Sequence, residues 1–321
     1  MARMQGKTTS EDFQYFAGVD VCKAHLDLRV FGETRGQRFP NDAAGIAALL
    51  ALLETPHLVM FEPTGRYHIA LWQALCAAGH GAVPYNPHWV RNLATGLGQL
   101  AKTDQIDAHV LCTIAEKIRP APKAAPRDTE LEIKELYAAR HSAIKRRAMV
   151  RTQITANPGA TVLALVTAEE AFLTTQITAM TAALTALIKV DETTRRRHKI
   201  LLSIPGIGEG AAAAILTLLP EIGSATNAEI AALAGTAPFN NDSGPIKGRA
   251  RTKGGRRALR TALHMPAIVA MRYNPDLKAF ADRLRKRGKH IYAVITATLR
   301  KLISLANTLV TENRLWTLEK P

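Results

Sequence analysis

The sequence predicts a mixed α/β domain, followed by a long helical arm and a mostly helical C-terminal domain. Three observations carry this prediction. Short runs of β-forming residues come first and then alternate with helical patterns, which is typical of a mixed sheet covered by helices. Residues 120–126, Pro-Ala-Pro-Lys-Ala-Ala-Pro, have the composition of a linker. Beyond this linker the periodicity is mostly helical.

The first domain is predicted to span residues 1–125, with a polar, frayed start. Its strands are rich in β-forming residues and are expected at residues 15–21, 25–31, 35–39, 57–62 and 82–85. Its helices have apolar residues at helical spacing, with Asp42 and Thr103 suited to cap two of them, and are expected at residues 43–54, 66–79 and 103–118.

The arm is predicted to span residues 126–195 and the C-terminal domain residues 196–321. Helical patterns at residues 128–155 and 161–190 are separated by Asn157-Pro-Gly, so we expect an antiparallel hairpin or coiled coil that could also dimerise. The C-terminal helices are expected on both sides of Pro205-Gly-Ile-Gly and at residues 227–234, 258–272 and 291–310, with a basic stretch at residues 283–289.

The charge of the chain predicts a polyanionic partner. Its 42 Lys and Arg against 27 Asp and Glu give a formal net charge of +15, and phosphate is the commonest partner of such a field. We expect no membrane, because no apolar run reaches the roughly 18 residues of a membrane span and no signal peptide is evident. Aromatic residues make up only 5%, so backbone phosphate contacts are expected to outweigh base stacking. Three scattered cysteines without a Cys-x-x-Cys pair predict a reducing cytoplasm.

Four acids lie at the ends of predicted elements in the first domain. Asp20 ends the first strand and Glu62 ends a later one. Asp104 and Asp107 are three residues apart, which puts both on one face of a helix. A ribonuclease H-like fold needs carboxylates at such places to gather a divalent metal, and two Mg²⁺ ions can clamp the attacking and leaving oxygens of a phosphodiester.

These acids also have ordinary structural explanations. Asp20 could cap a turn, and Asp104 with Lys102 could supply a charge at the start of a helix. Asp27 and Asp42 are rival acids in the same domain. Acids within a strongly basic chain are nevertheless what a metal-dependent nucleic-acid enzyme requires, so this interpretation is favoured.

Ser243 is the candidate nucleophile of the C-terminal domain. It lies at the centre of a loop of turn-forming residues, 238–245. A serine there could attack a phosphodiester, although Asn, Asp, Ser and Gly also favour turns for local reasons. Seven cations follow within fourteen residues and could bind phosphate: Lys247, Arg249, Arg251, Lys253, Arg256, Arg257 and Arg260.

Two other features could contact a nucleic-acid backbone. Residues 203–208, Ser-Ile-Pro-Gly-Ile-Gly, resemble a helix-hairpin-helix motif, whose glycines let backbone amides approach a phosphate. A plain glycine turn between packed helices is the alternative. The first helix of the arm has a basic face, for which a solvated surface and a nucleic-acid contact are equally open; it comprises Arg140, Lys145, Arg146, Arg147 and Arg151.

These motifs resemble the DEDD-type insertion-sequence transposases, a family that includes the Piv/MooV DNA invertases and the bridge-RNA-guided serine recombinases. The three acid motifs are matched at residues 18–23, 61–67 and 102–108, and the hairpin at residues 203–208. The C-terminal transposase domain of the family is matched at residues 234–238, 242–244, 254–255, 258–260, 272–275, 288–289 and 299–302.

The resemblance implies an α/β RuvC-like, ribonuclease H-like domain in which Asp20, Glu62, Asp104 and Asp107 hold Mg²⁺, with Mn²⁺ as an alternative ion. It implies that Ser243 forms a covalent phosphoserine link to DNA, in a composite site with acids of another protomer. It also implies an element-encoded structured RNA that pairs donor and target DNA. A dimer, or a tetramer in the synaptic complex, would act at the bacterial nucleoid in the cytoplasm.

The leading hypothesis is therefore a Mg²⁺-dependent, RNA-guided DNA recombinase that excises and inserts its mobile element by strand exchange. The alternatives are a RuvC-like junction-resolving nuclease that uses water, and a non-catalytic nucleic-acid-binding scaffold. The Ala/Thr-rich arm with its break at Asn157 departs from the family pattern. All four acids and the serine are present, so the sequence shows no sign of an inactivated enzyme.

Overall fold

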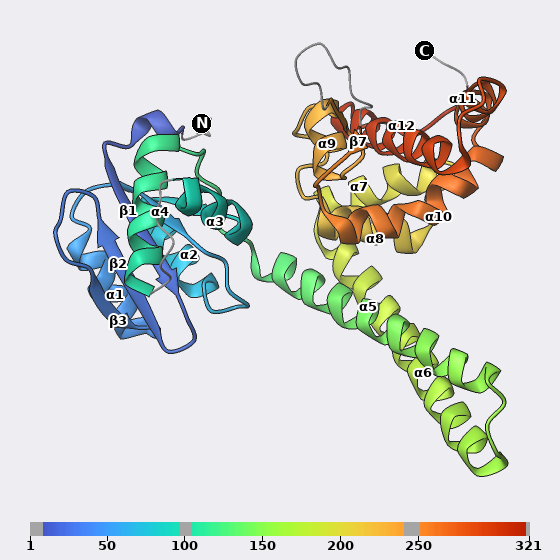
Figure 1. The fold of residues 1–321 in the computed structure, drawn as a ribbon, viewed down its shortest axis with the longest axis horizontal. Coiled ribbons are helices and arrows are strands. Elements are labelled where there is room, and N and C mark those ends of the chain that lie inside the picture. The colour runs from blue at the N-terminus through green and yellow to red at the C-terminus, as the bar shows by residue number, and fades with distance from the viewer. Residues whose placement is uncertain (1–8, 97–103, 241–250, 319–321) are drawn as a thin grey trace. The chain divides into compact units, whose positions relative to one another are not determined.

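The computed structural model describes residues 9–96, 104–240 and 251–318, with only the backbone described at residues 104–106 (Figure 1). The chain folds as two compact units, Met1–Arg127 and Asp128–Pro321. The division into three domains expected from the sequence stays a prediction. Each unit is described by itself.

The first unit is built on a mixed five-stranded sheet with the strand order β3-β2-β1-β4-β5. Its strands are β1 (Tyr15–Val21), β2 (His25–Val30), β3 (Gln37–Pro40), β4 (His57–Phe61) and β5 (Gly81–Pro84). The central strand β1 pairs antiparallel with β2 and parallel with β4. At the edges, β3 pairs antiparallel with β2 and β5 pairs parallel with β4. The predicted mixed α/β domain is confirmed.

Helices cover both faces of this sheet. Helices α1 (Ala43–Leu52) and α2 (Ile69–Ala77) pack on one face, against Val19 of β1 and Phe61 of β4. Helices α3 (Pro87–Gly96) and α4 (Asp104–Ile118) pack on the other, against Phe16 and Met60. This division follows from the alternation of side chains along each strand.

The α-helix α3 of the first unit was not predicted. Pro84 and Pro87 indicated the end of a strand, but Pro87 begins α3. A proline is tolerated at the first position of a helix, because the N–H that it lacks would have no partner within the helix.

The arm consists of α5 (Asp128–Thr155) and α6 (Ala160–Val190), on either side of the break predicted at Asn157. The two helices lie side by side along the arm (Figure 1). They pair through a buried strip in which Ala143 and Val150 meet Leu173 and Ile177. Asn157 adopts a positive φ of 52°, which is more accessible to Asn than to most other residues.

Contrary to the prediction, two of the described helices are long and apolar enough to cross a membrane, by length and composition alone: α6 and α12 (Ile291–Thr311). The polar groups of α6 are mainly threonines, and several of their hydroxyls, such as those of Thr178 and Thr185, donate to the carbonyl four residues earlier. However, α6 lies along the charged helix α5, and more than half of the apolar stretch of α12 is buried inside the protein.

The rest of the second unit is mostly helical, as predicted. Besides α12 it contains α7 (Glu192–Ser203), α8 (Glu209–Leu218), α9 (Asn227–Leu233), α10 (Arg257–Tyr273) and α11 (Pro275–Lys286). Their apolar side chains form one large core that includes Leu201, Ile215, Leu263 and Leu302.

Helix α11 was not predicted, because only its basic C-terminal end was recognised. Pro275 occupies its first position, and the side-chain oxygen of Asn274 caps it by accepting from the amide of Leu277 at 3.2 Å. This cap is fully buried.

Candidate active site

Asp20 and Glu62 lie at the same edge of the sheet. They directly follow the last register pair of the parallel strands β1 and β4, so both are at the carboxyl ends of neighbouring strands. Gly18 and Met60, two residues before each acid, face the side of the sheet that α4 covers. Strand alternation therefore carries Asp20 to the α4 side of the sheet.

The first turn of α4 lies toward this edge. A β-carbon at Gly18 would overlap the backbone of Ala108, so only a glycine lets the helix approach β1 so closely. Earlier on β1, the ring of Phe16 lies 4.9 Å from the guanidinium of Arg119, just past the end of α4. Helix α4 thus runs antiparallel to β1, with its beginning near Asp20.

Asp104 and Asp107 belong to that first turn. The buried face of α4 includes Ala108, Leu111 and Cys112, and one turn earlier the same face contains positions 104 and 107. Asp107 is partly exposed, whereas the side chain of Asp104 lies outside the described residues. The backbone therefore brings all four predicted acids toward one edge of the sheet. Among the described side chains, no three Asp, Glu, His or Cys form a group that could hold a metal ion.

The two rival acids have structural partners. Asp27 is buried on β2 and accepts from Nε and Nη2 of Arg38 at 2.8 and 2.9 Å. Asp42 caps α1, as predicted, by accepting from the amide of Gly45 at 2.8 Å.

Asn41 connects two segments next to the acids, and the sequence prediction missed this role. Its side-chain amide donates to the carbonyl of Cys22 at 2.7 Å and to that of Tyr67 at 3.1 Å. Cys22 follows β1 and Tyr67 belongs to the segment after Glu62. The only sequence signal is the position of Asn41 in the turn before α1, which does not reveal either partner.

Ser243, Lys247 and Arg249 lie outside the described residues. The chain on either side forms a short antiparallel ribbon of β6 (Pro238–Phe239) and β7 (Arg251–Thr252), in which Pro238 pairs with Thr252. These two strands were not predicted. They bring together the two ends of the segment that contains Ser243.

The described cations after Ser243 divide into two groups. Arg256 donates to both carboxylate oxygens of Glu221 at 2.6 Å, and Arg260 donates to the carbonyls of Gly235 and Gly254 at 3.3 and 3.0 Å. These two arginines hold the fold together. In contrast, Arg251, Lys253 and Arg257 are exposed.

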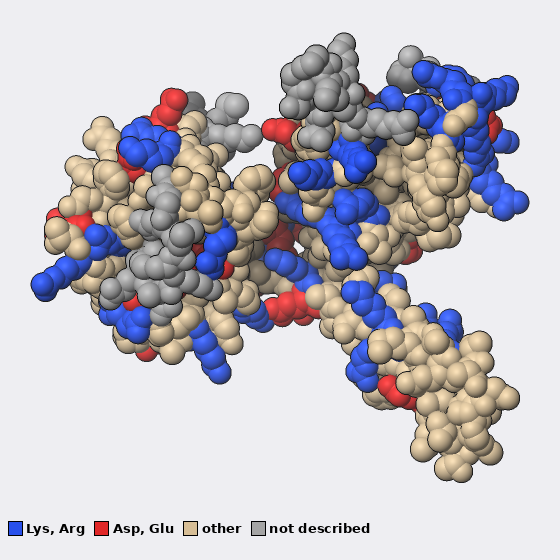
Figure 2. Space-filling model, viewed as in Figure 1, with Lys and Arg blue, Asp and Glu red and all other residues tan. Residues whose placement is uncertain are grey.

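The basic face of the arm is partly an interface between its helices. Four of its five cations bond to α6: Arg140 to Thr181 at 2.7 Å, Arg146 to Glu169 at 3.5 Å, Arg147 to Thr174 at 3.3 Å and Arg151 to Glu170 at 2.9 Å. Lys145 is exposed. The guanidinium groups therefore help to pair the two helices. Lys and Arg are nevertheless present on the surface of the arm, as Figure 2 shows.

The hairpin-like turn is explained in part by packing. Gly206 has a φ of 109°, and a β-carbon on it would overlap Ala270 of α10. This glycine is therefore needed for the turn and for its contact with α10. Gly208, which precedes α8, has no neighbour within 4 Å of the position of a β-carbon.

Two family models match the chain. A transposase model of the IS110 type, named for its DEDD acids, matches residues 17–157. The model of the transposase IS116/IS110/IS902 family matches residues 198–282. Together they cover more than two thirds of the sequence.

The chain is also similar to curated proteins. The pilin gene-inverting protein of Moraxella bovis is 26% identical over 313 residues, which cover 93% of this chain and 96% of that protein. The protein of the same name from Moraxella lacunata gives the same identity and coverage. An uncharacterized 43.6 kDa protein of insertion element IS110 from Streptomyces coelicolor is 29% identical over 194 residues, or 60% of this chain and 45% of that protein.

The mixed sheet with acids at one edge, followed by a helical second unit, defines a DEDD-type DNA strand-transfer enzyme with a ribonuclease H-like domain. The chain belongs to the IS110 family of DEDD transposases. Because this family consists of enzymes, membership excludes the alternative of a non-catalytic scaffold. A transposase acts on DNA, so membership also implies DNA binding.

The family implies a divalent metal ion, and the acids at the sheet edge match one in donor chemistry, although the described side chains do not gather into a group that could hold it. The four acids offer carboxylate oxygens, the ligands that Mg²⁺ prefers in proteins. The close approach of α4 at Gly18 fixes the position of the helix that carries two of them. The site thus has the donor chemistry that a hard divalent cation needs.

Proposed function

We propose that this transposase is a Mg²⁺-dependent recombinase that excises and inserts its element through a covalent serine–DNA intermediate, guided by an RNA. The observation that carries the proposal is the convergence of Asp20, Glu62 and the first turn of α4 at one edge of the sheet. The similarity to pilin gene-inverting proteins over nearly the whole chain supports breakage followed by rejoining.

The acids would bind the metal ion and hold it against the scissile phosphate. Asp20, Glu62, Asp104 and Asp107 are the ligands that we propose. When bound, such an ion neutralises charge that develops on the phosphate. Mn²⁺, which is also bound by oxygen ligands, would be able to replace Mg²⁺.

Ser243 would be the nucleophile. Its Oγ loses a proton and forms a bond to phosphorus, while the bond from phosphorus to one deoxyribose oxygen breaks and that oxygen gains a proton. The phosphodiester is conserved as phosphoserine, so a deoxyribose hydroxyl of a second strand can attack it and restore Ser243. We propose that the acids and Ser243 form a composite site, with the serine supplied by another protomer of a dimer or tetramer.

The acid site has a direct test in a matched pair of substitutions. Glu62→Gln should lower strand cleavage of element-end DNA by at least about 100-fold, because a metal ligand is lost without a change in size. Glu54→Gln, on an exposed position of the same unit, should cleave at the wild-type rate. Binding of Mn²⁺, followed by electron paramagnetic resonance, should weaken only in Glu62→Gln. Full cleavage by Glu62→Gln would contradict the proposal.

A RuvC-like nuclease that uses water remains the second candidate, because the acids alone provide what metal-dependent hydrolysis needs. It predicts that Ser243→Ala still cleaves DNA while Asp104→Asn does not. The serine mechanism predicts that both variants are inactive.

The RNA guide is proposed from the basic charge of the chain and from the resemblance. Expression with the native flanking DNA in bacterial cytoplasm, where we expect the protein at the nucleoid, should yield one abundant co-purifying RNA that maps to the element. Sequencing that finds only cellular RNAs in proportion to their abundance would contradict RNA guidance.

A further inference from the structure

One surface of the second unit has concentrated positive charge that the acid site and the serine loop do not use. It runs over residues 272–292, from the end of α10 along α11 to the start of α12, and is called the α11 surface here. These residues include seven Lys and Arg and only two Asp. All seven cations are exposed. Lys and Arg gather over the end of this unit where α11 lies, as Figure 2 shows.

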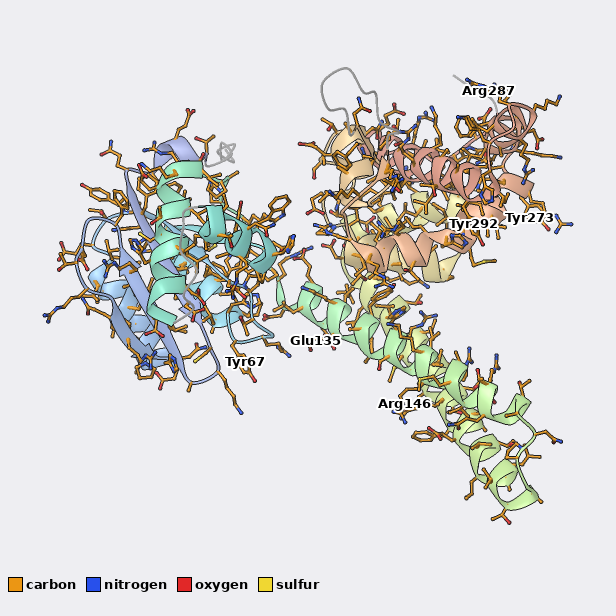
Figure 3. The ribbon with its side chains drawn as sticks, in the orientation of Figure 1. Tyr67, Glu135, Arg146, Tyr273, Arg287 and Tyr292 are labelled. Atoms are coloured by element: carbon orange, nitrogen blue, oxygen red, sulfur yellow. The ribbon has the colours of Figure 1, made fainter. Side chains whose placement is uncertain are left out.

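Two exposed tyrosines lie among these cations. Tyr273, at the end of α10, is 63% exposed, and Tyr292, at the start of α12, is 67% exposed. The guanidinium of Arg272 lies 5.7 Å from the ring centre of Tyr273, and the ring of His290 stacks on that of Tyr292 at 5.4 Å. In the view of Figure 3 both tyrosines project from the same end of the unit. Single exposed aromatic rings are ordinary, but two within one basic surface are typical of a binding site.

The backbone at both tyrosines is fixed. Tyr273 directly precedes Asn274, whose buried side chain caps α11. The amide of Tyr292 donates to the ring nitrogen Nδ1 of His290, the cap of α12, at 3.4 Å. Helix α11 is anchored in the core by Leu277 and Ala281. Both rings therefore project from rigid helix ends, which lowers the entropic cost of binding a ligand.

We propose that the α11 surface binds an unpaired segment of nucleic acid, with bases stacked on Tyr273 and Tyr292 and the phosphates held by the surrounding cations. Cations alone would bind any phosphate backbone. The tyrosines add a preference for unpaired bases, because the faces of paired bases are covered by their neighbours in a duplex. Aromatic residues are too few for base stacking to dominate nucleic-acid binding over the whole chain, so the proposed stacking is confined to this surface.

A lipid surface fits these residues less well. Interfacial helices insert large apolar side chains such as Leu, Phe or Trp below their basic residues. On α11 the aromatic Phe280 is only partly exposed, and its ring lies 6.0 Å from the guanidinium of Arg283 and 5.8 Å from the ammonium of Lys301. Nucleic acid is therefore the occupant that the surface chemistry favours.

The test uses the full-length protein and short labelled oligonucleotides in EDTA, so that neither metal nor Ser243 affects the result. Tyr273→Ala and Tyr292→Ala should each weaken binding of a single strand about 5- to 150-fold, as expected when one base can no longer stack. Tyr273→Phe and Tyr292→Phe should bind within about twofold of wild type, because stacking needs the ring and not the hydroxyl. The matched control is Phe172→Ala, which removes a ring that is 59% exposed on the arm.

An abasic strand of equal length and charge isolates the stacking. Both Tyr→Ala variants should bind the abasic strand and a blunt duplex as tightly as wild type does. Arg287→Ala should weaken binding of all three ligands and lower the salt dependence for the single strand by about 0.7 for each phosphate that is no longer neutralised. Parallel RNA and DNA strands identify the source of the segment, which is the guide RNA or a displaced DNA strand.

Several results would overturn the proposal. One is unchanged single-strand binding by both Tyr→Ala variants. Another is an equal loss of binding for the single strand, the abasic strand and the duplex, since this would show that the tyrosines touch only the backbone. A change of oligomeric state in these variants, measured by mass photometry and without a change in binding, would show an interface between protein chains instead. Preferential binding of anionic vesicles over the single strand would show a lipid site.

Discussion

Asp20 lies directly opposite Asp27 in the antiparallel register of β1 and β2. Residues so paired point to the same face of a sheet, so the two carboxylates are neighbours. Asp27 is only 4% exposed and is held by two hydrogen bonds from Arg38 on β3. One guanidinium thus offsets the charge of a buried acid beside a proposed metal ligand.

Arg38→Ala should lower the free energy of unfolding of the first unit by about 1–3 kcal/mol, because Asp27 would keep a buried charge without this partner. Half of the Arg38 side chain is exposed, which limits the loss. Adding Asp27→Asn should recover stability, because the charge is then removed. Urea unfolding checks both results. A stable Arg38→Ala single variant would contradict this account of the pair.

Gly18→Ala should displace α4 from the sheet. The added methyl group would overlap the backbone of Ala108, and overpacking of this kind costs about 1–3 kcal/mol or more. Cleavage should fall as well, because α4 carries two of the proposed ligands. Gly159→Ala is the matched control, since its added methyl group meets no atom within 4 Å. Equal stability of the two variants would show that the close approach at Gly18 is not needed.

The thiol of Cys112 should make stability depend on alkaline pH. Burial between α4 and β1 raises its pKa from 9.0 to about 12. The unfolded chain therefore loses the proton first, so this contribution is complete below pH 9 and is lost as the pH rises from 9 toward 12. The difference in unfolding free energy between wild type and Cys112→Ala should change by about 1.4 kcal/mol per pH unit in this range. A constant difference between pH 8 and pH 10.5 would contradict the burial of the thiol.

Substitution of the adjacent residues Arg256 and Arg257 should affect different properties, stability in the first case and DNA binding in the second. Arg256→Ala removes the bidentate bond to Glu221 and should destabilise the second unit by about 1–3 kcal/mol. Arg257→Ala, at an exposed position, should leave stability within about 0.5 kcal/mol of wild type. It should lower the salt dependence of duplex DNA binding by about 0.9, because one phosphate fewer is neutralised. Thermal unfolding and a salt titration of DNA affinity check these results. A larger loss of stability in Arg257→Ala than in Arg256→Ala would contradict the division of roles.

Local patterns were enough to predict most elements. Helix α5 has the bounds that its periodicity predicted, and Asp42 caps α1 as expected. Helix α3 was missed because Pro87 was taken as the end of a strand, and α11 because only its basic end was recognised, although a proline begins each helix. A proline at a helix start and a proline in a turn look alike in sequence.

The candidate site could be predicted only in part. The sequence placed Asp20 and Glu62 at strand ends, but the parallel pairing of β1 with β4 puts them at one edge. Pairing partners distant in sequence decide such details. Arg256 was predicted to bind phosphate, but it bonds to Glu221, which lies 35 residues away in the sequence.

The central claim is that Ser243 links covalently to DNA. Its most direct measurement is a denaturing gel of end-labelled element-end DNA after reaction with the protein, its RNA and Mg²⁺, with mass spectrometry to locate the modified residue. Wild type and the control Ser224→Ala should form a denaturation-resistant adduct that carries phosphoserine at position 243, and Ser243→Ala should form none. An adduct that persists in Ser243→Ala, or strand exchange by that variant without any adduct, would contradict the account.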